Sequence, residues 1–110
     1  MSEHLNSEFL DELREIMEDE FGSLIETFLE ESARQFAEVS EHWHAQDLDG
    51  VRRTAHSLKG SCANVGAQSM HRTCADLEYS ARDGNTQAIP ALLQTVATDL
   101  DQVRAELRQL

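Results

Sequence analysis

The sequence predicts an all-α protein, an antiparallel up-and-down four-helix bundle with a short extra helix at its N-terminal end. Good helix formers, such as Ala, Leu, Glu, Gln and Arg, dominate the composition. Aromatic residues make up 5% of the chain, which has one proline and five glycines. Apolar residues recur at spacings of three and four, as in amphipathic helices. The 110 residues suit a single domain, residues 1–110, which can bury a core without a disulfide or a metal.

An acidic segment, residues 17–20 (MEDE), separates the first two expected helices. The first helix is short, and Asn6 or Ser7 could cap its beginning. Its apolar positions are Leu5, Phe9, Leu10, Leu13, Ile16 and Met17. The second helix is long, running roughly from Glu20 to Ala45. Its apolar positions are Phe21, Leu24, Ile25, Phe28, Leu29, Phe36, Val39 and Trp43.

Three further helices complete the predicted bundle. The third begins after Asp47, a plausible N-cap, continues to about Val65 and ends at Gly66. The fourth stops at the turn formed by residues 83–85, and its apolar positions are Met70, Cys74, Leu77 and Ala81. The last has Pro90 near its beginning, where proline is tolerated. Its apolar positions are Leu92, Leu93, Val96, Leu100, Val103, Leu107 and Leu110. Four substantial helices with short connections favour an antiparallel bundle.

The net charge of −12 argues against nucleic acid or an anionic membrane as the main partner. No apolar run is long enough to span a membrane, and the acidic N-terminus does not resemble a signal peptide. We therefore expect a cytoplasmic location. Residues 1–50 hold 2 basic and 15 acidic side chains, whereas residues 51–110 hold 7 and 6. Between residues 51 and 82, five basic side chains are opposed only by Asp76 and Glu78. This locally basic region is either a site for an anion or an acidic partner, or a chance excess on a solvated face.

The sequence contains parts of two possible metal sites, and neither site is complete. A di-metal site in a four-helix bundle needs two Glu-x-x-His motifs, and only residues 41–44 (EHWH) supply that spacing. His71 and Cys74 could offer two zinc ligands, but no companion pair is evident. We expect no bound metal, and we expect the remaining histidines, His4, His42 and His44, on the surface. Cys62 and Cys74 could form a disulfide, although reduced core cysteines are more common in such a chain.

The segment from residue 52 to residue 67 carries the most chemical information. On a helix each residue turns by about 100°. Val51, Leu58, Cys62 and Val65 then cluster on the side opposite His56 and form the core face. Arg52, Arg53, Lys59, Gly60 and Ala63 lie within about 60° of His56. The pattern therefore turns His56 outward, beside cationic side chains and a residue without a side chain.

Each of these residue types has a chemical use beside an exposed histidine. A neutral imidazole is a competent nucleophile near pH 7. Lys59, one turn away, can offset the charge of a phosphoryl group. Gly60 leaves bare backbone where another protein could approach, although glycine costs about 1 kcal/mol relative to alanine in a helix. The alternative is that His56 is an ordinary surface histidine, and its combination with Lys59 and Gly60 weakens that interpretation.

Residues 55–67 (AHSLKGSCANVGA) resemble the signature of histidine phosphotransfer (HPt) domains, including stand-alone bacterial HPt proteins. Residues 74–78 (CADLE) and the turn at residues 82–84 resemble the next helix of that family and its end. The resemblance implies that His56 is the phospho-acceptor, that Lys59 supports the phosphoryl group and that Gly60 admits the partner's active site. The further residues expected to contact partners are Arg52, Arg53, Ser61, Ala63, Glu78 and Arg82. The main departure is Cys62, where Ser or Ala is common.

The resemblance also implies a place in two-component signalling. An aspartyl phosphate on a receiver domain would donate to His56, which would then donate to the aspartate of another receiver. The partners would be receiver domains of hybrid sensor kinases and response regulators, with Mg²⁺ supplied by the receiver. No glycine-rich phosphate loop is present, so we expect a phosphoryl carrier without an ATP site rather than an enzyme. We also expect this carrier to be a monomer. A docking or inhibitory module without phosphotransfer is the alternative. Met1 and the compact length favour a stand-alone protein over a domain excised from a larger kinase.

Overall fold

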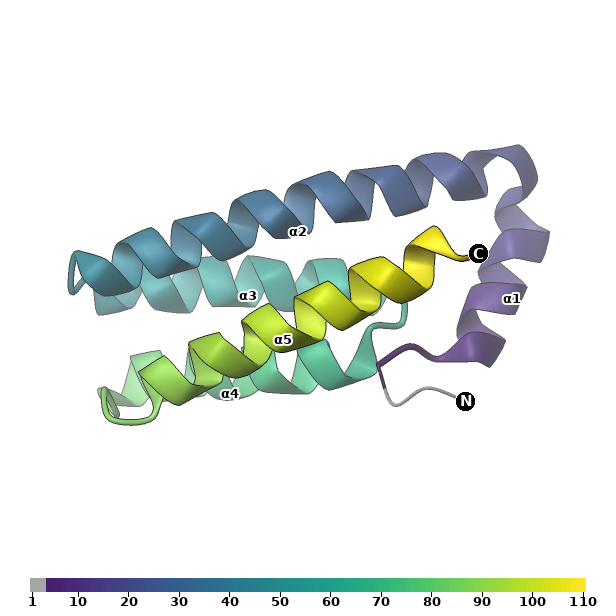
Figure 1. The fold of residues 1–110 in the computed structure, drawn as a ribbon. Coiled ribbons are helices and arrows are strands. Elements are labelled where there is room, and N and C mark those ends of the chain that lie inside the picture. Colours follow the sequence, from purple (N-terminus) through teal and green to yellow (C-terminus); the bar gives the residue numbers. More distant parts are fainter. Residues whose placement is uncertain (1–3) are drawn as a thin grey trace.

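A computed structural model describes residues 4–110, and in that range it contains five α-helices and one short 3-10 helix. These are α1 (Ser7–Met17), η1 (Glu18–Glu20), α2 (Phe21–His44), α3 (Leu48–Asn64), α4 (Gln68–Asp83) and α5 (Ile89–Arg108). Helices α2 to α5 lie alongside one another, and α1 crosses one end of the bundle (Figure 1). The molecule is elongated, 42 × 23 × 19 Å. The predicted four-helix bundle with a short extra N-terminal helix is confirmed.

The helix ends follow from local sequence. The side chain of Asn6 accepts a hydrogen bond from a first-turn backbone N–H of α1, and that of Asp47 does the same for α3. Gly66 and Gly84, which follow α3 and α4, have φ angles of 69° and 74°, in the left-handed region that glycine adopts without strain. Pro90 lies in the first turn of α5. The bounds that the sequence predicted for α2 and α3 are correct to within one or two residues.

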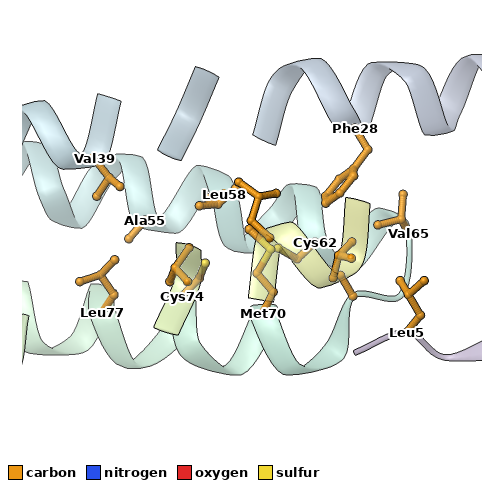
Figure 2. Packing of buried hydrophobic residues seen from close by; sticks show 14 of the residues in the cluster. Leu5, Phe28, Val39, Ala55, Leu58, Cys62, Val65, Met70, Cys74 and Leu77 are labelled. Carbon is orange, nitrogen blue, oxygen red and sulfur yellow. The ribbon is translucent and has the colours of Figure 1, made fainter. Parts of the chain in front are cut away.

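The apolar stripes of the helices meet in one continuous core. Figure 2 shows part of it, with Leu5, Phe28, Val39, Ala55, Leu58, Cys62, Val65, Met70, Cys74 and Leu77 labelled. Cys62 of α3 and Cys74 of α4 are free thiols that solvent does not reach. A hydrogen bond with Cys74, together with burial, raises the pKa of the Cys62 thiol far above its ordinary value. The expectation of two reduced core cysteines is confirmed.

Three residues lie elsewhere than expected. Ile16 is 78% exposed, because α1 crosses only the end of the bundle and the chain turns away at Glu18, whose φ angle is 50°. Leu110 is also exposed, two residues beyond the end of α5. His4 is mostly buried, with Nδ1 3.7 Å from a carboxylate oxygen of Asp99. The segment that contains His4 lies against the bundle. A backbone N–H of this segment donates a hydrogen bond to the turn between α3 and α4.

No helix within residues 4–110 is long and apolar enough to cross a membrane.

Candidate functional site

His56 lies in the middle of α3, on the side that faces solvent. Its side chain is 64% exposed, whereas Val51, Leu58 and Cys62 of the same helix are fully buried. These two faces result from the turn of about 100° per residue, and the orientation inferred from the helical period is confirmed. An exposed imidazole on a rigid helix can be reached by another protein without rearrangement of the bundle.

One carboxylate connects His56 to Lys59. Glu78, on α4, has Oε2 2.9 Å from Nδ1 of His56 and Oε1 2.8 Å from Nζ of Lys59. His56 and Lys59 are three residues apart, so they are neighbours on one face of α3, and a single side chain from α4 reaches both. The Glu78 and Lys59 side chains are only 19% and 27% exposed. The three groups form a chain from ammonium to carboxylate to imidazole.

The ionisation of Glu78 determines which nitrogen of the imidazole is free. The hydrogen bond from Lys59 is the largest effect on the Glu78 carboxyl and lowers its pKa; His56 acts in the same direction, while burial opposes both. Glu78 is therefore ionised near neutral pH, and an ionised carboxylate only accepts hydrogen bonds. In the neutral ring the proton consequently lies on Nδ1, and Nε2 keeps its lone pair.

The surface of α3 next to the imidazole carries small residues. Gly60 is exposed, and a Cβ atom added to it would meet no atom within 4 Å. Ala63 continues the same exposed face. Ser61 points away from this face, because its hydroxyl donates a 3.0 Å hydrogen bond to Gln35 of α2. A partner could therefore approach His56 over Gly60 and Ala63 without meeting a long side chain.

The arginines near the site already have contacts within the domain. Arg52 and Arg53 both donate to Asp49, at 2.8 and 2.9 Å, and these hydrogen bonds lower the pKa of the Asp49 carboxyl. Arg82 stacks on the ring of Tyr79, with 4.2 Å between Cζ and the ring centroid. The structure thus brings Lys59 and Glu78 into contact with His56, while the three arginines are held in contacts of their own.

Two features of this site were not predicted from the sequence. Glu78 was expected among the partner contacts, without its contacts to His56 and Lys59, which join residues of different helices. Tyr79, an exposed aromatic residue next to Glu78, was not expected at the site. A helical projection of residues 74–82 could have indicated that Glu78 and Arg82, four residues apart, share a face of α4.

Residues 4–110 contain no group of three or more His, Cys, Asp and Glu side chains that could hold a metal ion. Cys74 lies in the core, and His71 is half-buried. His42 is also half-buried, with Nδ1 3.2 Å from the carboxylate of Asp47, and of the four histidines other than His56 only His44 is well exposed.

A comparison with protein families matches the Hpt domain to residues 23–106, most of the chain. The chain belongs to the Hpt family. This Hpt domain is therefore a phosphoryl shuttle rather than a catalytic enzyme, and the family implies receiver domains as partners. No curated protein sequence matches it significantly.

Two solved structures share its fold. The crystal structure of histidine-containing phosphotransfer protein B (HptB) from Pseudomonas aeruginosa PAO1 is 36% identical, with a TM-score of 0.96. That match covers 99% of this Hpt domain and 95% of the HptB chain. The histidine-containing phosphotransfer protein ZmHP2 from maize is 23% identical, with a TM-score of 0.85, over 97% of this chain and 88% of that one. The maize protein is similar in fold.

Proposed function

We propose that this Hpt domain accepts a phosphoryl group from a receiver aspartate onto Nε2 of His56 and passes it to the aspartate of another receiver. The observation that carries the proposal is the 2.9 Å contact between Nδ1 of His56 and the Glu78 carboxylate. It directs the lone pair of an exposed imidazole outward, as attack on phosphorus requires. Membership of the Hpt family supports the same function.

The transfer step needs little chemistry from this domain. The Nε2 lone pair forms the bond to phosphorus as the bond to the donor aspartate oxygen breaks, and the aspartate carboxylate leaves with the electron pair. No proton has to be removed, because Nδ1 keeps its hydrogen and the phosphorylated ring is a cation. The Glu78 carboxylate beside Nδ1 balances that positive charge. The reverse sequence returns the phosphoryl group to a receiver.

The receiver supplies the remaining components. Phosphoryl transfer depends mainly on alignment and on stabilisation of charge. We expect Mg²⁺ to come with the receiver, which would dock over Gly60 and Ala63. Lys59 adds positive charge close to the reacting groups, and Arg52, Arg53 and Arg82 surround the site as candidate contacts. We also expect the domain to act as a cytoplasmic monomer.

The experiment is transfer of labelled phosphate from a phosphorylated receiver domain to the purified protein. We expect acid-labile, base-stable phosphate on the wild type and none on His56→Gln. Because His56 lies outside the core, the thermal melt of His56→Gln should match that of the wild type. His71→Gln is the matched control and should still be labelled.

Three results would contradict the proposal. Labelling of His56→Gln would place the phosphate on another residue. Unfolding of that variant would mean that the side chain has a structural role. Binding of the receiver without labelling of the wild type would indicate a docking module that does not transfer phosphate.

A further inference from the structure

A pocket of about 320 Å³ opens between α1 and the C-terminal end of α5. Figure 1 shows these two segments together at the end of the bundle that α1 crosses. Three leucines line the pocket, the buried Leu5 and Leu10 and the exposed Leu110. Two carboxylates line it as well, those of Asp11 on α1 and Glu106 on α5. The pocket therefore combines an apolar wall with two acidic groups.

The Glu106 carboxylate lies in an unfavourable position for a negative charge. It belongs to the last turn of α5, where the backbone carbonyls already carry partial negative charge. Its Oε2 atom is buried, and within residues 4–110 it has neither a hydrogen bond nor an ion pair. A buried acceptor without a partner destabilises the folded state. A cationic donor that entered the pocket from outside would remove both disadvantages.

The charge around the pocket favours a cation. Residues 7–20, which include α1, hold seven acidic side chains and one basic side chain. Within the part of the chain that the structure describes, none of these seven carboxylates forms an ion pair. The basic residue is Arg14, whose guanidinium lies 5.1 Å from the centroid of the Phe21 ring. This end of the bundle attracts positive charge, whereas a second copy of the chain, with its net charge of −12, would be repelled.

The apolar surface next to the pocket indicates a ligand larger than a small cation. Leu110 also lines a second cavity, of about 590 Å³, between α2 and α5. The apolar side chains of that cavity are those of Phe21, Ile25, Leu29 and Leu107, and the exposed Arg14, Glu26 and Arg108 line it too. A lysine or arginine packs its aliphatic stem on apolar groups while its charged end meets carboxylates. The two adjacent cavities thus fit a protein segment that carries a basic residue beside apolar ones.

We infer that the pocket between α1 and α5 binds a lysine or arginine side chain of a partner protein, at a surface separate from the one around His56. None of the residues that line the pocket belongs to α3 or α4. A partner bound there would hold this domain and leave His56 open to a receiver. This interaction goes beyond the proposed function and does not depend on it.

The first test measures binding of a labelled amphipathic helical peptide of leucine and lysine, by fluorescence anisotropy at physiological ionic strength. We expect saturable binding to the wild type, and binding roughly tenfold weaker to Glu106→Gln and to Asp11→Asn. The same peptide with acetylated lysines should not bind. The thermal melt of Glu106→Gln should be equal to or higher than that of the wild type, because a neutral amide replaces a buried, unpaired carboxylate.

Glu12→Gln is the matched control for the loss of one negative charge. Glu12 is an exposed residue of α1 that does not line the pocket, so its replacement should weaken binding by less than about twofold. An equal loss in Glu12→Gln and Glu106→Gln would show that the peptide responds only to the overall charge, and the inference would be wrong. Absence of saturable binding to the wild type would also overturn it. A lower melting temperature of Glu106→Gln would assign the carboxylate to the fold, unless Asp11→Asn, with an unchanged melt, still lost binding.

The second test locates the bound peptide. Nitrogen-15 NMR of the wild-type protein should show shifts at Asp11, Glu106 and Leu110 and none at Gly60. Shifts centred on α3 and α4 would mean that the peptide occupies the receiver surface, which would overturn the separate site. Saturation of the same shifts by spermidine or Mg²⁺ at a similar concentration would indicate a site for small cations instead. Transfer from a phosphorylated receiver should proceed at the same rate with the peptide bound, and a failure of transfer in the free protein would concern only the proposed function.

Discussion

Gly60 lies one turn beyond His56 on the exposed side of α3, about 40° around the helix. A Cβ atom there would meet nothing, so Gly60→Gln introduces no clash within the domain. Because glycine costs about 1 kcal/mol in a helix interior, we expect the thermal stability of this variant to be equal or higher. The new side chain would project over the surface beside His56, and we expect weaker receiver binding and slower transfer.

Gly22 provides a matched control for this substitution. It lies near the beginning of α2, is exposed, and also has nothing within 4 Å of an added Cβ. Gly22→Gln should likewise have equal or higher thermal stability, and it should transfer phosphate at the wild-type rate. If Gly60→Gln also transfers at the wild-type rate, receivers do not dock over His56 as proposed. A sharp fall in its melting temperature would mean that this part of α3 is packed rather than open.

At the level of the helices, the turns after α3 and α4 use glycine in two different ways. Gly66 and Gly84 both have positive φ angles, which cost about 1–2 kcal/mol for a residue with a side chain. A Cβ on Gly66 would also lie 2.7 Å from the ring of Phe9 in α1, whereas a Cβ on Gly84 would meet nothing within 4 Å. Gly66→Ala should therefore lower the free energy of unfolding by more than Gly84→Ala, as measured by urea titration. Equal losses would mean that Phe9 moves aside without cost.

The helices themselves could be predicted from the sequence, because caps and apolar periodicity are local signals. The N-cap Asp47 and the turn at Gly66 were placed correctly, and Asn6 is one of the two N-caps that the sequence allowed for α1. The pairing of His56 with Glu78 was not, because it joins positions 22 residues apart and depends on how α4 is rotated against α3. The exposure of Ile16 was missed for a related reason: the period alone does not say how much of a helix meets the bundle.

On the scale of the whole molecule, the two faces of α3 have different roles. The buried face contributes to stability, and the exposed face carries the residues of the proposed transfer site. Leu58, two residues after His56, is fully buried in the core. Leu58→Ala should lower the free energy of unfolding by about 2–5 kcal/mol, a large part of the 5–15 kcal/mol typical of a domain. Well below its melting temperature this variant should still accept phosphate, because Leu58 does not belong to the exposed face.

His56→Gln is the converse variant: we expect its thermal melt to match that of the wild type, and we expect it to accept no phosphate. Paired melts and transfer assays of the two variants check the separation. Loss of transfer in folded Leu58→Ala would mean that core packing sets the geometry of the site.

Both cysteines of the chain lie in the core, so the surface of the folded protein within residues 4–110 carries no reactive thiol. Cys62 and Cys74 are inaccessible, and the hydrogen bond with Cys74, together with burial, raises the pKa of the Cys62 thiol and keeps it protonated. A maleimide dye would therefore bind a cysteine introduced at an exposed position, such as Gly22, while both natural cysteines remain in place. A spectroscopic probe could be attached at a chosen point of the bundle, and the distance to a labelled receiver could be followed during docking without any change to the core.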